Sequence, residues 1–220
     1  MKPRGCLFDM DGVIVDSARH HFTAWKRLAD ELSIPFTEND NHALKGLSRV
    51  DSLEHILALG HLHLDEATKV RLMDQKNAWY LALISSMRAG DILPGAKELI
   101  LACKAEGIAV ALGSSSRNAQ LVLDNIGLAQ HFDAVVDGNH ITLSKPDPEV
   151  FLKGAQLLGL DPSECVVFED AAAGVEAGKA GGFAVVGLGD PSVLGDADLV
   201  LPSLADFTLT TLREALGWDT

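Results

Sequence analysis

The chain has 220 residues, of which 47% are hydrophobic and 22% are charged, as in soluble globular proteins with a sizeable core. Its formal net charge of −13 argues against nucleic acids and anionic membranes as partners, because binding their phosphates requires surplus Lys and Arg. No apolar stretch approaches the roughly 18 residues of a membrane span, and Asp9 interrupts the early one, so we expect no signal peptide and a cytoplasmic protein. The cysteines Cys6, Cys103 and Cys165 form no CxxC pair, so we expect buried thiols in a reducing compartment.

The first predicted element is a buried strand within residues 6–16, because hydrophobic residues fill both of its faces. Asp9 and Asp11 interrupt this run, although carboxylates are seldom fully buried without a partner. Side chains two residues apart on a strand share a face, about 6–7 Å from each other, so this pair requires a nearby cation or a proton. Gly12 then permits a sharp turn or a close ligand. Taken alone, the DxDG motif is equally compatible with a strand that ends in a polar turn.

Residues 17–88 have a helical pattern without strand-like alternation. Hydrophobic residues recur at helical spacing from Phe22 to Leu32, and two further helical stretches follow. A short polar loop at residues 44–49 carries two cations. A helical block inserted directly after a first strand predicts a separate cap domain, which we place at residues 16–87.

From residue 91 onward, predicted strands and helices alternate with short connections. The expected strands are short apolar runs at residues 108–112, 134–136, 165–168, 184–187 and 199–201. Repeated strand-then-helix order with apolar strands predicts a parallel sheet that helices cover on both faces. We therefore expect an α/β protein with a Rossmann-like parallel-sheet core, formed by residues 1–15 and 88–220, and an inserted α-helical cap domain.

Polar residues follow several of these strands, at the edge where open parallel sheets bind their ligands. They are Asp9, Asp11, Ser114, Lys145, Glu169 and Asp170. Each has an ordinary alternative: Ser114 could cap a helix, Lys145 could be a solvated surface residue, and the acid pair could begin a helix. Their joint placement at the ends of several strands is harder to explain in this way.

These residue types together indicate phosphoryl transfer. Carboxylates without His or Cys favour Mg²⁺, which usually shares its ligand shell with a substrate phosphate. A hydroxyl and an ammonium beside the metal could stabilise the oxygens of a transferring phosphoryl group. One aspartate could attack phosphorus to form an aspartyl phosphate, while the other moves the proton. The residues leave the substrate open.

In order and spacing, these motifs resemble the haloacid dehalogenase (HAD) superfamily of phosphotransferases. The resemblance implies that Asp9 is the nucleophile and Asp11 the general acid and base. It further implies that Ser114 and Lys145 act on the transferring group. The implied ligands of Mg²⁺ are Asp9, the main-chain carbonyl of Asp11, Glu169 and Asp170. An acid at position 11 favours phosphoryl chemistry over dehalogenation.

Further motifs resemble one family of this superfamily, the β-phosphoglucomutases. They lie at residues 21–25, 44–49, 76–77 and 114–116. The resemblance implies that Arg49 binds the phosphate that is not being transferred, and that His21 and Lys76 help position the general acid and base on closure. The other implied substrate contacts are Lys45, Gly46, Ser52 and Lys76 on the cap side, and Ser116 and Asn118 on the core side.

The expected reaction requires a cationic group outside the metal site, and Arg49 suits this role. A mutase that works through a bisphosphate holds a phosphate at each end of one sugar, and an Arg in a Gly-containing loop suits bidentate phosphate binding. The alternative is that Lys45 and Arg49 are solvated loop charges. Two positions depart from the family pattern, since Ser115 replaces a smaller residue and Ser17 replaces a more usual Thr at the expected hinge.

The resemblance predicts an isomerase of carbohydrate metabolism that interconverts β-D-glucose 1-phosphate and glucose 6-phosphate. We expect one Mg²⁺ per chain, β-glucose 1,6-bisphosphate as the activating phosphoryl donor, sugar phosphates as the only partners, and a monomer. A Mg²⁺-dependent sugar-phosphate phosphatase is the alternative, with the same core residues and water as the acceptor. A non-catalytic sugar-phosphate sensor is disfavoured because every core acid is present.

Overall fold

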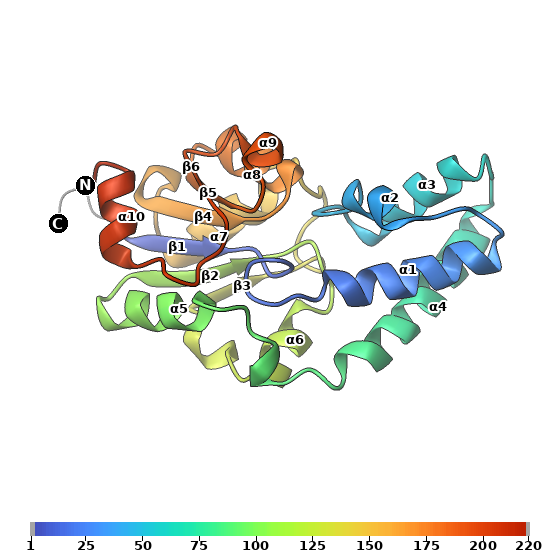
Figure 1. The fold of residues 1–220 in the computed structure, drawn as a ribbon, viewed down its shortest axis with the longest axis horizontal. Coiled ribbons are helices and arrows are strands. Elements are labelled where there is room, and N and C mark those ends of the chain that lie inside the picture. Colours follow the sequence, from blue (N-terminus) through green and yellow to red (C-terminus); the bar gives the residue numbers. More distant parts are fainter. Residues whose placement is uncertain (1–2, 219–220) are drawn as a thin grey trace.

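The computed structural model describes residues 3–218 and contains a six-stranded, fully parallel sheet (Figure 1). The strand order is β3-β2-β1-β4-β5-β6, so the N-terminal strand lies near the centre. The strands are β1 (Gly5–Phe8), β2 (Ala109–Gly113), β3 (Ala134–Val136), β4 (Cys165–Glu169), β5 (Ala184–Leu188) and β6 (Leu199–Leu201). Phe8 is in register with Leu112 of β2 and with Phe168 of β4, which aligns the carboxyl ends of the three central strands.

Helices cover both faces of this sheet, and alternate strand residues pack against each layer. Phe8 lies in a buried cluster with α5 (Ala96–Ala105), α6 (Ala119–Ile126) and α10 (Leu209–Ala215). Leu7 points to the other face, into a cluster with α7 (Glu149–Leu158), α8 (Ala172–Ala180) and α9 (Pro191–Leu194). This period of two within β1 is what a strand buried on both faces requires.

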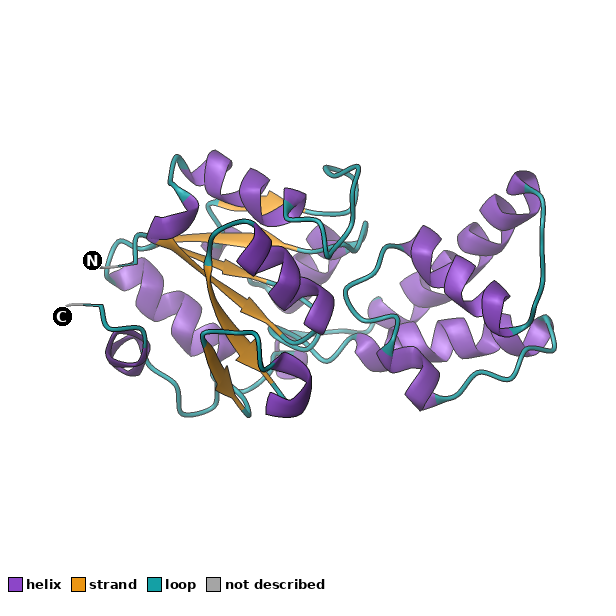
Figure 2. Ribbon diagram, turned by 90° about the horizontal axis from the view of Figure 1, so that it is seen from above, coloured by secondary structure: helices purple, strands orange, loops and turns teal. Residues whose placement is uncertain are grey.

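A group of helices inserted between β1 and β2 lies beyond one end of the sheet (Figure 2). It consists of α1 (Ala18–Glu31), α2 (Glu38–His42), α3 (Arg49–Leu59) and α4 (Glu66–Ile84). These helices bury their own hydrophobic cluster around Trp25, Leu28 and Ile56. We call this segment the cap and the sheet with its helices the core. The expected fold class, a parallel-sheet core with an inserted helical cap, is confirmed.

Two details of the expected secondary structure are corrected. The first strand ends at Phe8, so Asp9 and Asp11 lie in the following loop and not on a strand face. Gly12 has a φ of +86° there and its N–H bonds the carbonyl of Val15, so the chain turns as soon as it leaves the sheet. The short helix α2 was not expected from the sequence; Thr37 and Asp40 form its capping box.

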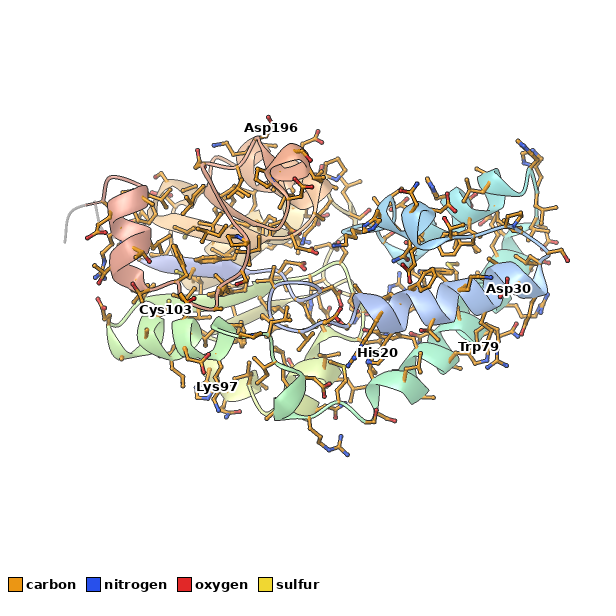
Figure 3. All side chains as sticks on the ribbon, in the orientation of Figure 1. His20, Asp30, Trp79, Lys97, Cys103 and Asp196 are labelled. Atoms are coloured by element: carbon orange, nitrogen blue, oxygen red, sulfur yellow. The ribbon has the colours of Figure 1, made fainter. Side chains whose placement is uncertain are left out.

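The connections between cap and core are short on both sides of the insertion. The first runs from the loop after β1 through Ser17, which precedes α1 and is fully buried. The second leaves α4 and passes through a 3₁₀ turn at Ala89–Asp91 before α5. Figure 3 shows Asp30 and Trp79 on the cap and Lys97, Cys103 and Asp196 on the core. None of the helices in residues 3–218 is long and apolar enough to cross a lipid bilayer.

Candidate active site

A cavity of about 790 Å³ lies between the cap and the carboxyl edge of the sheet, and most of the predicted site residues line it. Parallel strands deliver their C-terminal residues to one edge, which brings Asp9, Ser114 and Asp170 together from distant parts of the sequence. The predicted residues that line the cavity are Asp9, Asp11, His21, Lys45, Gly46, Arg49, Ser52, Lys76, Ser114, Ser116, Asn118 and Asp170. Lys145 and Glu169 lie buried behind this lining, in contact with each other.

Three carboxylates form the floor of the site. Oxygen atoms of Asp9, Glu169 and Asp170 all lie within 4.8 Å of one another. Lys145 joins two of them, because its Nζ atom is 2.5 Å from Asp9 Oδ1 and 2.8 Å from Glu169 Oε2. Burial and the nearby Asp9 raise the pKa of Glu169 to about 8. Burial acts to lower the pKa of Lys145, but Asp9 and Glu169 overcome this and raise it above its usual value.

This floor suits a hard divalent cation. All of its donors are carboxylate oxygens, which are the ligands that Mg²⁺ prefers. Two glycines make room for them: a Cβ atom at Gly12 would overlap the carboxylate of Asp170, and one at Gly174 would overlap that of Glu169. Burial raises the pKa of Asp170, against the lowering effect of the Lys45 charge. The residues therefore fit a magnesium site.

Asp11 is the second acid of the DxDG motif and lies beside the floor. Its carboxylate accepts a hydrogen bond from the hydroxyl of Ser17, the residue that precedes α1. Burial, and then the charge of Asp9, raise the pKa of Asp11 to about 7. A carboxyl group with this pKa can both give and take a proton near neutral pH, which is what a general acid and base requires.

A row of stacked side chains lines the cap side of the cavity. Lys76 Nζ is 2.9 Å from Nδ1 of His21 and lies over the rings of Trp25 and Tyr80, 4.4 and 4.9 Å from their centroids. The imidazole of His21 packs on Tyr80 with a centroid separation of 4.0 Å. Burial and the Arg49 charge lower the pKa of Lys76 to about 7, and burial and Lys76 hold the pKa of His21 well below its usual value.

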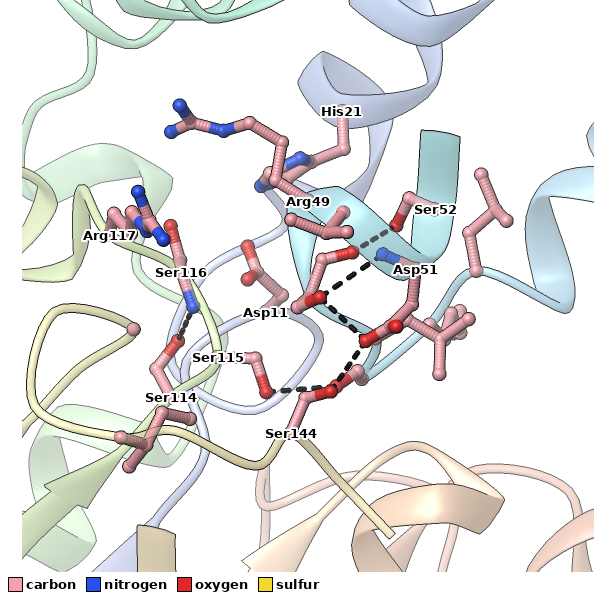
Figure 4. Close-up of a pocket in the computed structure, with 18 of the residues that line it drawn as sticks. Asp11, His21, Arg49, Asp51, Ser52, Ser114, Ser115, Ser116, Arg117 and Ser144 are labelled. Atoms are coloured by element: carbon pink, nitrogen blue, oxygen red, sulfur yellow. Dashed lines mark hydrogen bonds between the residues drawn. The ribbon is translucent and has the colours of Figure 1, made fainter. Parts of the chain in front are cut away.

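A second group of cations lies apart from the carboxylate floor. Arg49 donates to Asn77 Oδ1 at 2.8 Å, and Asn118 Nδ2 donates to the same oxygen at 2.9 Å. Figure 4 shows the guanidinium groups of Arg49 and Arg117 on the same side of the cavity. Burial, and then the charge of Arg117, lower the pKa of Arg49. Within residues 3–218 neither guanidinium forms an ion pair, so both are available to an anionic ligand.

The sequence analysis missed Arg117 as a site residue. Its signal was present, since it is a cation between the predicted substrate contacts Ser116 and Asn118. Ser114 is buried, and its Oγ accepts the N–H of Ser116 at 3.1 Å. Ser52 also lines the cavity, but its hydroxyl donates a hydrogen bond to the carbonyl of Ser48, the residue that precedes α3, at 2.8 Å.

Polar contacts across the cavity connect the cap with the core. Lys45 Nζ lies 2.7 Å from Asp170 Oδ2, which places a cap cation on the carboxylate floor. Next to it, Ser115 Oγ donates to the carbonyl of Gly46 at 2.9 Å. A third contact joins Ser144 Oγ to Asp51 Oδ2 at 2.6 Å. The structure thus holds the cap against the core around the mouth of the cavity.

Comparison with known proteins places this geometry in a family. Residues 3–182 match the model of the haloacid dehalogenase-like hydrolases. The chain is 42% identical to a β-phosphoglucomutase of Bacillus subtilis over 213 residues, which cover 96% of this chain and 94% of the relative. It is 31% identical to a phosphorylated carbohydrates phosphatase of Thermotoga maritima, over 96% of this chain and 98% of the relative.

The fold of this chain also matches a solved structure over nearly its whole length. A crystal structure of β-phosphoglucomutase from Clostridium difficile superimposes with a TM-score of 0.95 at 36% identity, covering 99% of this chain and 98% of that one. Sequence similarity to these relatives thus extends over both the parallel-sheet core and the inserted cap. It includes the part of the chain that carries the acids and the lysine of the site. The chain belongs to the haloacid dehalogenase-like hydrolase family.

Proposed function

We propose that this chain catalyses the β-phosphoglucomutase reaction, the interconversion of β-D-glucose 1-phosphate and glucose 6-phosphate through β-glucose 1,6-bisphosphate. One relative that carries this name is 42% identical in sequence, and another, of known structure and 36% identical, superimposes with a TM-score of 0.95. The observation that carries the proposal is the pair Arg49 and Arg117, two guanidinium groups that line the cavity apart from the carboxylate floor and form no ion pair within residues 3–218. A bisphosphate needs a cationic site for each of its phosphates, and this cavity has two.

The proposed reaction begins with Asp9 carrying the phosphoryl group as an acyl phosphate. Asp11 takes the proton from the sugar 6-hydroxyl while that oxygen attacks phosphorus and the bond to Asp9 breaks, which frees the Asp9 carboxylate. After the bisphosphate reorients, Asp9 attacks the 1-phosphate and Asp11 returns the proton to the leaving oxygen. The raised pKa of Asp11, about 7, supports both of its roles.

Other residues would bind and orient the reacting groups. We assign Lys145 and Ser114 to the oxygens of the transferring group, because Lys145 contacts Asp9 and the buried Ser114 lines the same cavity. Mg²⁺ would be held by Asp9, Glu169, Asp170 and the carbonyl of Asp11, and when bound it neutralises phosphoryl charge. We assign Arg49, Arg117, Ser116 and Asn118 to the other phosphate. The cap residues Lys45, Gly46, Ser52 and Lys76 are assigned to the sugar phosphate on the cap side, and His21, through Lys76, to positioning at closure.

We also propose the division of the chain into a core (1–15 and 88–220) and a cap (16–87), of which residues 1–2 and 219–220 lie outside the described residues. The separate hydrophobic cluster of the cap supports this division. A cytoplasmic monomer is likewise proposed; the free, buried thiols of Cys6, Cys103 and Cys165 agree with a reducing compartment.

A sugar-phosphate phosphatase is the second candidate. It is favoured by the 31% identity to the Thermotoga phosphatase over nearly the full length of both chains. This reaction would use the same floor, with water in place of the sugar hydroxyl as the acceptor of the phosphoryl group.

Phosphorus NMR separates the two candidates. The purified protein is mixed with Mg²⁺, β-glucose 1-phosphate and a trace of glucose 1,6-bisphosphate. A mutase converts the β-anomer to glucose 6-phosphate with little release of free phosphate, and it forms no glucose 6-phosphate from the α-anomer. Asp9→Asn serves as the inactive control. Free phosphate as the main product would contradict the mutase and support the phosphatase.

A further inference from the structure

Two of the contacts between cap and core involve side chains that have no role in the proposed reaction. Ser115 Oγ donates to the carbonyl of Gly46 at 2.9 Å, and Ser144 Oγ bonds Asp51 Oδ2 at 2.6 Å. Figure 4 shows Ser144 beside Asp51, with Ser115 close to them. Each pair joins residues far apart in the sequence, so neither contact serves local secondary structure.

We propose that these two contacts form a latch that selects the acceptor of the phosphoryl group, favouring a sugar hydroxyl over water. The inference deepens the proposed function and rests on it. It assigns acceptor selectivity to Ser115 and to the Ser144–Asp51 pair. None of these side chains needs to contact the reacting atoms, so they are positioning residues.

The place of the Ser115 contact explains how it could act. Gly46 has a φ of +78°, and this turn presents its carbonyl to the core. A Cβ atom at Gly46 would lie 3.5 Å from that of Ala171, in ordinary contact, so the cap loop rests directly on the start of α8. The neighbouring Lys45 reaches Asp170 on the carboxylate floor. The bond from Ser115 therefore holds down the loop that covers the floor.

The Asp51 contact is fixed by the start of a cap helix. Asp51 lies in the first turn of α3, and its carboxylate also accepts from the hydroxyl of Ser48, the N-cap residue, at 2.6 Å. Ser144 precedes Lys145, the lysine of the floor. The contact thus ties the first turn of α3, which carries Arg49, to the loop that supplies the buried lysine.

The chemical consequence follows from the competition at phospho-Asp9. In the open state a water oxygen can attack phosphorus, Asp11 takes its proton, and the bond to Asp9 breaks to give inorganic phosphate. In the closed state the same attack comes from the sugar hydroxyl, because water is excluded. Losing one neutral hydrogen bond changes an equilibrium constant about two- to tenfold. Loss of the Ser115 bond should therefore raise the open fraction, and with it the hydrolysis, by this factor.

The test compares Ser115→Ala, Ser144→Ala and the double variant with the wild type. Ser85→Ala is the matched control, because its hydroxyl also donates to a carbonyl, that of Ala82 at 2.7 Å, but within the cap. Phosphorus NMR gives the ratio of inorganic phosphate to glucose 6-phosphate formed from β-glucose 1-phosphate with Mg²⁺. We expect this ratio to rise about two- to tenfold in Ser115→Ala, at least as much in Ser144→Ala, whose hydrogen bond is to a carboxylate, and further in the double variant, with Ser85→Ala unchanged.

A second readout follows closure without any catalysis. The three native cysteines are buried, so labels attached at Asn39→Cys in the cap and Asp196→Cys in the core, both at exposed positions, report the distance between cap and core. We expect Ser115→Ala to lengthen the average label distance with Mg²⁺ bound. Unchanged distances and an unchanged product ratio in an active mutase would overturn the latch. If the wild type forms only phosphate, the proposed function is contradicted; a longer label distance in Ser115→Ala than in that wild type would still support the two contacts as closing contacts.

Discussion

The Nζ atom of Lys76 lies 2.9 Å from Nδ1 of His21 in the cap wall of the cavity, where Lys76 is buried and His21 is partly buried. Two bases this close cannot both carry a proton at low cost. The structure meets this constraint by lowering both pKa values, that of Lys76 to about 7 and that of His21 well below its usual value. Without a ligand, the wall therefore holds a lysine whose charge depends on pH in the neutral range.

We expect Lys76→Met to stabilise the fold near neutral pH, and to do so less as the pH rises. Below pH about 7 the folded and unfolded chains both hold the Lys76 proton, and the folded chain bears the full cost of burying it. Between pH 7 and the usual lysine pKa of 10.5 only the unfolded chain keeps this proton, so the wild type gains stability relative to the variant as the pH rises. This gain is about 2–4 kcal/mol between pH 7 and 10.

Urea unfolding of both proteins at pH 7, 8, 9 and 10 measures this difference. Lys97→Met is the control, because Lys97 is exposed on α5 and its loss should give a difference independent of pH. A constant difference between the wild type and Lys76→Met across this range would show that Lys76 keeps an ordinary pKa in the folded chain.

The fold and the floor of the site could be predicted from the sequence because their signals are local or topological. Apolar strands followed by helices dictate a parallel sheet, and such a sheet collects its strand ends at one edge. Asp9, Lys145 and Glu169 were therefore predicted to meet, although more than a hundred residues separate the first from the other two, and the distances of 2.5 and 2.8 Å confirm it.

What the sequence could not reveal depends on tertiary contacts. The end of the first strand at Phe8 was missed, because apolar residues continue through Val13, Ile14 and Val15 beyond the turn. Those residues are buried by packing outside the sheet and so resemble strand residues in the sequence. The position of Arg117 next to two predicted substrate contacts was visible in the sequence, but its place beside the Arg49 charge arises only when the cap folds against the core. The position of the cap relative to the core produces no periodic pattern of hydrophobic residues in the sequence of either segment.

The assignment of Asp11 as the general acid and base predicts the effect of Asp11→Asn. This substitution keeps the shape of the side chain and removes the group that carries the proton, so the mutase rate should fall about 10²- to 10⁴-fold. Phosphorus NMR of glucose 6-phosphate formation measures the rate, and thermal unfolding with Mg²⁺ verifies that the variant is folded. A folded variant that retains more than a tenth of the rate would exclude this role for Asp11.

If Arg49 and Arg117 bind the phosphate that is not transferred, their loss should weaken binding of a bisphosphate more than that of a substrate with one phosphate. Arg49→Ala should raise the KM for glucose 1,6-bisphosphate about 10- to 100-fold, because a charge-assisted contact to phosphate is lost. Hydrolysis of p-nitrophenyl phosphate, which has a single phosphate, should change less than about threefold since the carboxylate floor is intact. Arg117→Ala should behave in the same way.

If Arg49→Ala impaired both reactions equally, the guanidinium would be acting on the transferring group, contrary to the assignment. If it impaired neither, Arg49 would be a solvated loop charge. Arg88→Ala is a suitable control, because Arg88 is an exposed arginine near the second connection and does not line the cavity.

Gly174 tests the magnesium site without changing any of its ligands. This glycine lies in α8, and a Cβ atom there would overlap the carboxylate of Glu169. In Gly174→Ala the carboxylate has to move away from Asp9 and Asp170, and displacing a metal ligand in this way should weaken Mg²⁺ binding about 10- to 100-fold. Alanine is otherwise the better helix former by about 0.5–1 kcal/mol, so the variant should remain folded.

Thermal unfolding at increasing Mg²⁺ concentration measures the binding, because a ligand that binds only the folded chain stabilises it by RT ln(1 + [L]/Kd) and so raises the unfolding temperature once its concentration exceeds the Kd. The wild type should show this rise, and Gly174→Ala should need a correspondingly higher concentration for the same shift. Gly90→Ala is the matched control, since no atom lies within 4 Å of a Cβ atom at Gly90. Equal Mg²⁺ dependence in all three proteins would mean that Glu169 does not help hold the metal, because only its carboxylate is displaced by the added methyl group.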